Sequence, residues 1–581
     1  MNVETKPQRS KEELMEKLSQ PDLITGSEIL LRSLLLEGVD CVFGYPGGAV
    51  LYIYDAMHDF TDFNHLLTRH EQGAIHAADG YARSTGKVGV CIATSGPGAT
   101  NLVTGIATAY MDSVPLVVIT GNVATNFIGT DAFQEADITG ITMPITKHSY
   151  LVRDVNDLPR IIHEAFHIAS TGRKGPVLID IPKDVSAQKT VYHPVNQVNI
   201  RGYNPTVHPN KQQVDKLIKA IEEAERPVIL AGGGVVYSGA SQEIIEFVNK
   251  TRIPITTTLL GLGGFPSAHE LWMGMPGMHG TFAANFALQH ADLIISIGSR
   301  FDDRVTMKLD GFAPMAKKIA HIDVDPAEIG KNIKTDIPVV GDIKAVLEYA
   351  NTKAKPAQSA AWLVEIDKQK TAHPLRYKDS ETELKPQYVI EMINETTGGE
   401  AIVTTDVGQH QMWTAQYYKF KNPRSMVTSG GLGTMGFGFP SAIGAQMGNP
   451  DKLVVSINGD GGIQMCSQEL AICAINNIPV KIVIINNQVL GMVRQWQEII
   501  HDQRFSHIDL AGSPDFVKLA EAYGVKGLRA SNKEEARKVW QEALDTPGPV
   551  MIDFVVRRDE NVFPMVRAGD TISDIILGDS E

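Results

Sequence analysis

The stretch LVVSINGDGGIQMCSQELAICAINNIPVKIVIINN, residues 453–487, decides the fold. Each end is an apolar run rich in Val and Ile, which indicates a buried strand, and the segment between the two runs is helix-like. A strand, a helix and a second strand in this order predict a βαβ unit of a parallel sheet. Asp460 follows the first strand and Asn487 ends the second, 27 residues further along the chain.

Asp460 and Asn487 are candidate ligands of one metal ion. In an open α/β sheet, ligands bind just outside the carboxyl ends of the strands, near a topological switch point. A carboxylate and an amide oxygen suit Mg²⁺, which keeps further positions for phosphate oxygens. Gly461 and Gly462 would let a diphosphate approach the backbone at a helix N-terminus. Either half alone is more often a simple turn or strand end, but together at this spacing they favour a metal-diphosphate site.

The rest of the chain also alternates strand-like and helix-like segments, in three blocks after a polar leader. Strand-like runs such as GVCIATS, PLVVIT and PVLIDIP, then PVILAGGG, DLIISIG and KIAHIDVD, are typical of parallel sheets covered by helices on both faces. Two aperiodic stretches, 193–211 and 351–360, are interpreted as linkers. We therefore expect an α/β protein with three doubly wound parallel-sheet domains, residues 22–192, 212–350 and 375–556, and an irregular tail, 557–581. The first and third blocks both contain a strand, a Gly-rich turn and a helix, which hints at duplication.

Composition excludes several classes of function. The 581 residues carry a formal net charge of −14, which argues against a nucleic-acid-binding surface. No apolar run approaches the length of a membrane span, and the N-terminal residues lack the apolar core of a secretory signal. The four cysteines form no CxxC pair, and Cys466 and Cys473 are expected to face a core. These features predict a cytoplasmic enzyme without membrane or nucleic-acid partners.

The combination of GDG and NN resembles the fingerprint of thiamine diphosphate-dependent enzymes. Over nearly the whole chain, the sequence resembles the catalytic subunit of acetohydroxyacid synthase, also called acetolactate synthase. The matching segments, in the family's order, are FGYPGGAVL, RHEQGAIHAADGYAR, TSGPGATN, IDIPKDV, SRFDDRVT, GGLGTMGFGFP and GMVRQWQ. The resemblance implies the thiamine diphosphate-binding fold, in which pyrimidine and diphosphate domains flank a Rossmann-like central domain.

The resemblance also implies an activity. Two pyruvates would give 2-acetolactate and CO₂, and pyruvate with 2-oxobutanoate would give 2-aceto-2-hydroxybutyrate, in the biosynthesis of valine, leucine and isoleucine. The implied cofactors are thiamine diphosphate, Mg²⁺ and FAD. A homodimer or homotetramer and a small regulatory subunit are implied as partners. A catabolic, FAD-independent acetolactate synthase, a flavin oxidoreductase similar to pyruvate oxidase, and a non-catalytic binding protein stay open as alternatives.

The family's site residues transfer onto matching positions of this sequence. Glu71 matches the glutamate that bonds the aminopyrimidine ring nitrogen, although the same position also suits a carboxylate that only stabilises a helix N-terminus. Gln134 and Lys183 match further catalytic positions that line the substrate cavity. The other positions matching substrate contacts are Gly48, Ala49, Phe133, Met492 and Trp496.

The cofactor positions follow in the same way. Those matching thiamine diphosphate contacts are Val407, Gly408, Gln409, His410, Gly433, Met435, Gly461 and Gly462. Those matching FAD contacts are Arg173, Gly232, Gly233, Thr258, Leu259, Met278, His279, Gly298, Arg300, Asp302, Arg304, Asp323 and Asp342. The sequence departs from the family at Met307, where glycine is expected, and this places a bulky side chain near the expected flavin region.

Overall fold

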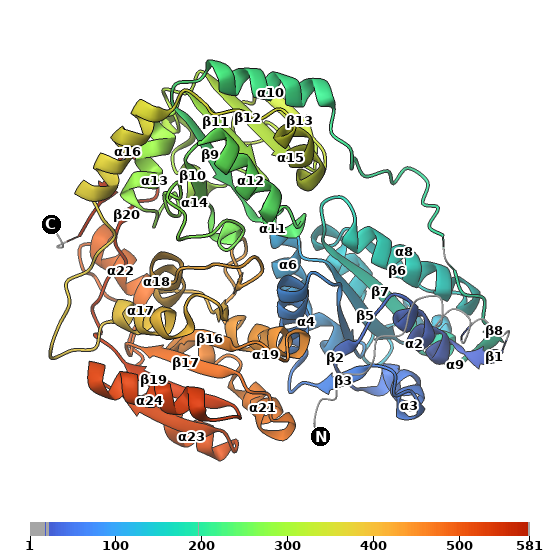
Figure 1. The fold of residues 1–581 in the computed structure, drawn as a ribbon. Helices are drawn as coiled ribbons and strands as arrows, with labels where there is room; N and C mark the ends of the chain where they lie inside the picture. The colour runs from blue at the N-terminus through green and yellow to red at the C-terminus, as the bar shows by residue number, and fades with distance from the viewer. Residues whose placement is uncertain (1–17, 19–21, 196, 579–581) are drawn as a thin grey trace.

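Three parallel sheets, one for each block, form the framework of the protein in the computed structural model (Figure 1). The structure describes residues 18, 22–195 and 197–578, so the polar leader, apart from Leu18, lies outside the described residues. The predicted fold class, α/β with three parallel-sheet domains, is confirmed.

The first block contains a six-stranded sheet with helices on both faces. In spatial order its strands are β3 (Asn64–Leu67), β2 (Cys41–Tyr45), β4 (Gly89–Ala93), β5 (Leu116–Asn122), β7 (Pro176–Pro182) and β6 (His148–Leu151). Its helices are α2 (Gly26–Leu36), α3 (Leu51–Asp59), α4 (Glu71–Thr85), α5 (Pro97–Thr100), α6 (Val103–Asp112), α7 (Ile138–Thr142), α8 (Leu158–Ser170) and α9 (Lys183–Ala187). A small antiparallel pair, β1 (Leu23–Thr25) and β8 (Lys189–Val191), joins the two ends of the block.

The middle block contains a five-stranded parallel sheet. Its strands, in spatial order, are β10 (Ile255–Thr257), β9 (Pro227–Ala231), β11 (Leu293–Ile297), β12 (Lys318–Asp323) and β13 (Ile337–Val340). Its helices are α10 (Lys211–Glu223), α11 (Gly233–Tyr237), α12 (Ser241–Thr251), α13 (Phe282–His290), α14 (Asp303–Thr306), α15 (Ile343–Asn351) and α16 (Ala360–Ala372). The sequence analysis did not predict α16, which follows the second linker and buries Trp362 and Ile366 in a cluster with residues of α13.

The third block contains a second six-stranded parallel sheet. In spatial order its strands are β15 (Met426–Thr428), β14 (Ile402–Thr405), β16 (Val454–Gly459), β17 (Lys481–Asn486), β19 (Val550–Val555) and β18 (Lys526–Ala530). Its helices are α17 (Pro386–Thr397), α18 (Gln409–Tyr417), α19 (Gly438–Gly448), α20 (Asp460–Ile463), α21 (Leu470–Asn476), α22 (Gly491–Ile500), α23 (Phe516–Ala522) and α24 (Lys533–Asp545). The tail after it contains the short antiparallel pair β20 (Met565–Val566) and β21 (Ile575–Ile576).

The first and third sheets have the same strand order. Numbered along the chain within each block, both read 2-1-3-4-6-5, which supports the duplication that their shared turn pattern suggests. In every block the order reverses between the first and third strands, and crevices for ligands form at such switch points. The switch points lie between β2 and β4, between β9 and β11, and between β14 and β16.

Helices α4 and α19 cross backbone to backbone and join the first and third blocks (Figure 1). A Cβ atom on Gly80 would lie 2.0 Å from the carbonyl oxygen of Ser441, and one on Gly444 would lie 1.7 Å from that of Ala77. Only glycine allows so close an approach. The two glycines therefore set how closely the helices approach, and large apolar side chains such as Tyr81 and Phe439 pack around the crossing.

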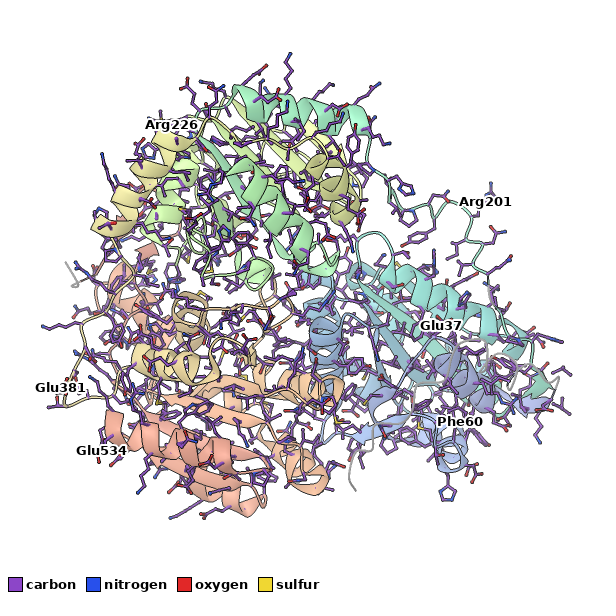
Figure 2. The ribbon with its side chains drawn as sticks, in the orientation of Figure 1. Glu37, Phe60, Arg201, Arg226, Glu381 and Glu534 are labelled. Carbon is purple, nitrogen blue, oxygen red and sulfur yellow. The ribbon has the colours of Figure 1, made fainter. Side chains whose placement is uncertain are left out.

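The first linker, which contains Arg201, and the segment between α16 and the third block, which contains Glu381, run over the outside of the molecule (Figure 2). All four cysteines are buried and free, as expected for Cys466 and Cys473. Burial raises the pKa of each thiol, so the thiolate form is disfavoured at neutral pH. Among the described residues, no helix is both long and apolar enough to cross a bilayer.

Candidate active site

A cavity of about 830 Å³ opens between the middle and third blocks, and the first block closes one side of it. It touches the switch points of the middle and third sheets, where we expect ligands. Many of the cofactor and substrate residues predicted from the sequence line this cavity: Arg173, Gly233, Thr258, Leu259, Met278, His279, Gly298, Arg300, Asp302, Arg304, Asp323, Asp342, Val407, Gly408, Gly433, Met435, Met492 and Trp496. The structure thus brings most of the residues expected to bind FAD into one cavity with Met435, the residue expected to support the thiazolium ring.

Asp460 and Asn487 lie at the carboxyl ends of neighbouring strands. Asp460 begins α20 directly after β16, and Asn487 directly follows β17. The two strands pair in parallel with Gly459 opposite Ile485. Both side chains are buried, with 2 % and 6 % of their surface exposed. The βαβ geometry predicted from the sequence is confirmed.

The donor set at these strand ends fits a magnesium ion. Oδ2 of Asp460 is buried without a hydrogen-bond partner, and burial raises the pKa of this carboxyl to about 7. A cation would stabilise the ionised form of this otherwise unpaired carboxylate. Oδ1 of Asn487 accepts one long hydrogen bond, 3.3 Å from the backbone nitrogen of Val489, and keeps capacity for a ligand. Mg²⁺ is commonly held by so few protein ligands, because waters and phosphates complete its shell.

Asp406 was missed by the sequence analysis, although it follows strand β14 just as Asp460 follows β16. Its buried carboxylate accepts hydrogen bonds from the backbone nitrogens of Val407, at 2.7 Å, and Gly436, at 3.0 Å. A Cβ atom on Gly462 would lie 2.0 Å from its Oδ2. Burial raises its pKa to about 7. Asp406 therefore contacts three turns: the one after β14, the one before α19 and the one after β16. These turns carry the predicted contacts with the diphosphate and the thiazolium ring.

His410 is suited to an anionic ligand despite its lack of charge. It lies in the first turn of α18, and burial lowers its pKa to about 4, so the ring is neutral. Its Nε2 is buried without a partner, and its ring packs against Gly408 and Gly459. A neutral imidazole can donate a hydrogen bond to a phosphate oxygen. The adjacent helix N-terminus adds backbone N–H groups.

Glu71 lies apart from this cavity within the single chain. It is the first residue of α4, is 9 % exposed, and accepts a hydrogen bond of 2.9 Å from Nδ2 of Asn101. Two residues before Glu71, the backbone nitrogen of Arg69 donates a hydrogen bond of 3.1 Å to the carboxylate of Glu469. Glu469 ends the short helix η7 (Ser467–Glu469) of the third block. The part of the third block nearest to the start of α4 is therefore η7, and not the cavity wall around Met435.

The first-block residues predicted to bind substrate lie near Glu71. The backbone nitrogen of Ala49 donates to Thr94 at 3.1 Å, and a Cβ atom on Gly98 would lie 2.7 Å from Thr94 and 3.3 Å from Glu71. At Gly48 a Cβ would meet no atom within 4 Å, so this glycine faces open space.

Of the other three first-block residues, Phe133 and Gln134 lie in a loop and Lys183 begins α9. Gln134 packs against Gly96, with its Cβ atom 2.9 Å from where a Cβ of Gly96 would stand. Lys183 places its ammonium 5.9 Å from the centre of the Tyr52 ring. Phe133 is 88 % exposed. Within one chain the structure brings none of these residues to the cavity that contains Trp496.

The middle block offers a glycine-lined wall for a dinucleotide. A Cβ atom on Gly232 would lie 2.2 Å from the carbonyl oxygen of Gly298, so the turns after β9 and β11 touch through their backbones. Gly232 itself is shielded from the cavity, whereas Gly233 and Gly298 line it. Glycines at these turns leave the backbone open to a pyrophosphate, so the wall fits the predicted FAD.

Three charged residues of the predicted FAD site also have partners within the chain. Arg173 pairs with Glu328 at 2.6 Å and with Asp325 at 3.3 Å, and so ties the first block to the middle block. Asp302 caps α14, and Asp342 caps α15. These hydrogen bonds give each residue a structural role beside any contact with a ligand.

Met307 adopts a backbone conformation that normally requires glycine. It follows α14 with φ of 54° and ψ of −120°, a region that costs an ordinary side chain about 1–3 kcal/mol. Its side chain is 8 % exposed and belongs to the apolar cluster that contains Met278, Phe301 and Phe312. Met278 and Val305 of this cluster line the cavity and Met307 does not, so the Met307 side chain belongs to the core behind the predicted FAD site.

Met307→Gly should be more stable than Met307→Ala. Both variants lose the packed side chain, but only glycine relieves the strain at positive φ, so we expect a difference of about 1–2 kcal/mol in the free energy of unfolding. Urea denaturation of the two variants, followed by circular dichroism, measures this difference. Equal stability, or a more stable alanine variant, would contradict the strain at this position.

Comparison with known proteins agrees with this geometry. The chain matches three parts of one family: "Thiamine pyrophosphate enzyme, N-terminal TPP binding domain" over residues 24–141, "central domain" over 214–349 and "C-terminal TPP binding domain" over 406–554. It is 51 % identical over 564 residues to the acetolactate synthase of Mycobacterium bovis, covering 95 % of this chain and 91 % of that protein.

Two further relatives are similar over comparable lengths. The acetolactate synthase large subunit of Lactococcus lactis is 48 % identical, over 97 % of this chain and 98 % of that protein. Acetolactate synthase 1, chloroplastic, of Nicotiana tabacum is 47 % identical, over 95 % of this chain and 84 % of that protein. Because both the identity and the coverage are high, the chain belongs to the thiamine pyrophosphate enzymes and, among them, to the acetolactate synthase large subunits.

Proposed function

We propose that this protein condenses two molecules of pyruvate to 2-acetolactate and CO₂, and pyruvate with 2-oxobutanoate to 2-aceto-2-hydroxybutyrate. These products belong to the biosynthesis of valine, leucine and isoleucine. The observation that carries the proposal is the single cavity that joins Met435, Trp496 and the glycine wall of the middle block. Asp460 and Asn487, beside this cavity, would hold Mg²⁺.

Thiamine diphosphate, when bound, supplies a thiazolium carbon that adds to the keto group of a 2-keto acid and allows loss of CO₂. Met435, which lines the cavity and has its methyl carbon 3.7 Å from the Cβ position of Gly461, would support its thiazolium ring. His410 and the N-terminus of α18 would bind its diphosphate together with the metal. Glu71 would exchange a proton with the aminopyrimidine ring nitrogen.

Trp496 and Met492 would shape the site of the second 2-keto acid. They lie four residues apart on α22, on the helix face that lines the cavity. A broad apolar ring favours the ethyl group of 2-oxobutanoate over the methyl group of pyruvate, because the additional buried methylene contributes about 1 kcal/mol. FAD would bind along the glycine-lined wall of the middle block. Its role would be structural, since the reaction involves no net redox change.

A second copy of the chain would complete the site. Glu71 and its neighbours in the first block do not line the cavity of their own chain. Large apolar side chains are exposed both in the first block and in the third block beside the cavity: Leu51, Tyr52, Phe133 and Met143 in the first, and Leu432 and Met465 in the third. Such exposed apolar surface marks interaction sites. We therefore infer a homodimer in which the first block of one subunit faces the third block of its partner. A dimer of dimers and a small regulatory subunit are further proposed assemblies.

A competition assay tests the proposed function. The purified protein with thiamine diphosphate and Mg²⁺ is given pyruvate and 2-oxobutanoate, with and without FAD, and both acetohydroxyacids are quantified. We expect 2-aceto-2-hydroxybutyrate to predominate and FAD to be required, and Trp496→Leu to lower the product ratio about fivefold while acetolactate still forms. The exposed Val493 on the same helix provides a control, since Val493→Ala should keep the ratio.

The other outcomes separate the alternatives. Acetolactate alone, without any dependence on FAD, would assign the chain to the catabolic enzymes. Consumption of an electron acceptor with release of acetate or acetyl phosphate would indicate a flavin oxidoreductase.

A further inference from the structure

Three buried amide side chains connect the expected metal site to the interior of α22. Nδ2 of Asn487 donates to Oε1 of Gln409 at 3.3 Å, and Nε2 of Gln409 donates to Oε1 of Gln495 at 2.9 Å. The three residues are 6 %, 3 % and 0 % exposed, so water does not compete for these hydrogen bonds. We call Asn487, Gln409 and Gln495 the amide relay.

Gly491 leaves no free space around the relay. A Cβ atom at this position would lie 2.0 Å from Oε1 of Gln409 and 2.7 Å from Nδ2 of Asn487. The first turn of α22 therefore packs its bare backbone against the hydrogen bond that joins these two side chains. This close packing leaves both side chains little room to move apart.

The far end of the relay holds the C-terminal tail. Nε2 of Gln495 donates to the carbonyl oxygen of Val562 at 2.9 Å, and the backbone nitrogen of Val562 donates back to Oε1 of Gln495 at 2.9 Å. Gln409 also donates to the carbonyl oxygen of Glu560 at 3.0 Å. Four residues beyond Val562, the backbone nitrogen of Val566 donates to the carbonyl oxygen of Met278, which lines the cavity, at 2.8 Å.

We propose that Gln495 is a positioning residue that couples the metal ligand Asn487 to the C-terminal tail through Gln409. This inference rests on the proposed Mg²⁺ and thiamine diphosphate site. Since Asn487 donates its amide nitrogen to Gln409, its oxygen is the atom left to face a cation. Hydrogen bonds of this kind orient metal ligands, and their loss commonly weakens metal affinity by about 10–100-fold. The side chain of Gln409 is thus used in the relay. Its predicted contact with the diphosphate would be made by its backbone N–H group, at the N-terminus of α18.

Coupling of this kind acts in both directions. If an ordered tail favours the ligand orientation of Asn487, bound Mg²⁺ must stabilise the ordered tail by the same free energy. Arg567 is exposed directly after β20 of the tail and provides a tryptic cleavage site that reports on this order. In the wild-type protein, we expect Mg²⁺ with thiamine diphosphate to slow cleavage at Arg567.

The decisive variant is Gln495→Met, which keeps the length of the side chain but removes its hydrogen bonds. We expect the Mg²⁺ concentration for half-maximal retention of thiamine diphosphate, measured by calorimetry, to rise about 10–100-fold. We also expect Mg²⁺ to lose its effect on the cleavage rate at Arg567. Gly491→Ala, which leaves Gln495 in place and inserts a methyl group into the relay, should weaken Mg²⁺ binding in the same way.

Gln497→Met is the matched control on the same helix. Gln497 makes the same pair of hydrogen bonds to one backbone residue, Ser506, at 3.1 Å and 3.0 Å, but takes no part in the relay. Mg²⁺ affinities of Gln495→Met and Gly491→Ala within twofold of this control would overturn the inference, and so would a loosened tail with unchanged affinity. A wild-type protein that retains no thiamine diphosphate with Mg²⁺ would overturn the proposed function and the inference with it.

Discussion

Asp460→Ala is expected to lose at least about 100-fold in Mg²⁺-dependent affinity for thiamine diphosphate, because loss of a direct ligand costs more than loss of its supporting hydrogen bonds. The variant should fold normally without metal. Oδ2 of this buried carboxylate has no partner within the protein, so the protein loses an unsatisfied polar atom, while the backbone N–H groups of Gly461 and Gln488 lose an acceptor. Equilibrium dialysis with and without Mg²⁺ measures the affinity, and thermal unfolding of the metal-free protein checks the fold.

Asp451 offers the control for this experiment. It is exposed and precedes the same strand, β16, at the opposite edge of the sheet. Asp451→Ala removes the same charge from the chain and should leave cofactor binding unchanged. Retention of activity by Asp460→Ala without added metal would remove Asp460 from the proposed site.

Glu71→Gln is expected to lower the rate of carboligation by about 10²–10⁴-fold while thiamine diphosphate still binds, because the amide keeps the shape but cannot exchange the proton. Turnover close to wild type would exclude Glu71 from the reaction. Measured together, the two variants separate binding from chemistry, since only Asp460→Ala should lose the cofactor.

Co-expression of the two inactive variants tests where Glu71 acts. If each site takes Glu71 from one subunit and Asp460 from the other, a mixed dimer contains one intact site and one with both changes. Half of the dimers formed at random are mixed, so about a quarter of wild-type activity should return. If both residues serve the same subunit, no combination restores an intact site and the mixture stays inactive.

The placement of Asp460 and Asn487 could be predicted from the sequence because it depends on local features. Two apolar runs of strand length, with a helix-length segment between them, determine that both residues end adjacent parallel strands. The same reasoning could have identified Asp406, which also follows an apolar strand, but a single carboxylate without a second ligand at a fixed spacing gave no reason to choose it.

Contacts between distant segments could not be predicted in this way. Arg173 matches a flavin contact by its position, yet its partners Asp325 and Glu328 lie some 150 residues further along the chain. Gln495 showed no pattern at all, because its importance comes from Gln409 and Val562, which only the folded chain brings together. The separation of Glu71 from the cavity is likewise a property of the whole fold.

The glycine crossing of α4 and α19 has a consequence for synthesis of the chain. Helix α4 ends at Thr85 and is buried along almost its whole length, but α19 begins only at Gly438. Ribosomes add about 5–20 residues per second, so the roughly 350 residues between the two helices take about 20–70 seconds to emerge. If the first block folds as a unit during synthesis, one side of α4 stays uncovered for that time, until α19 is made.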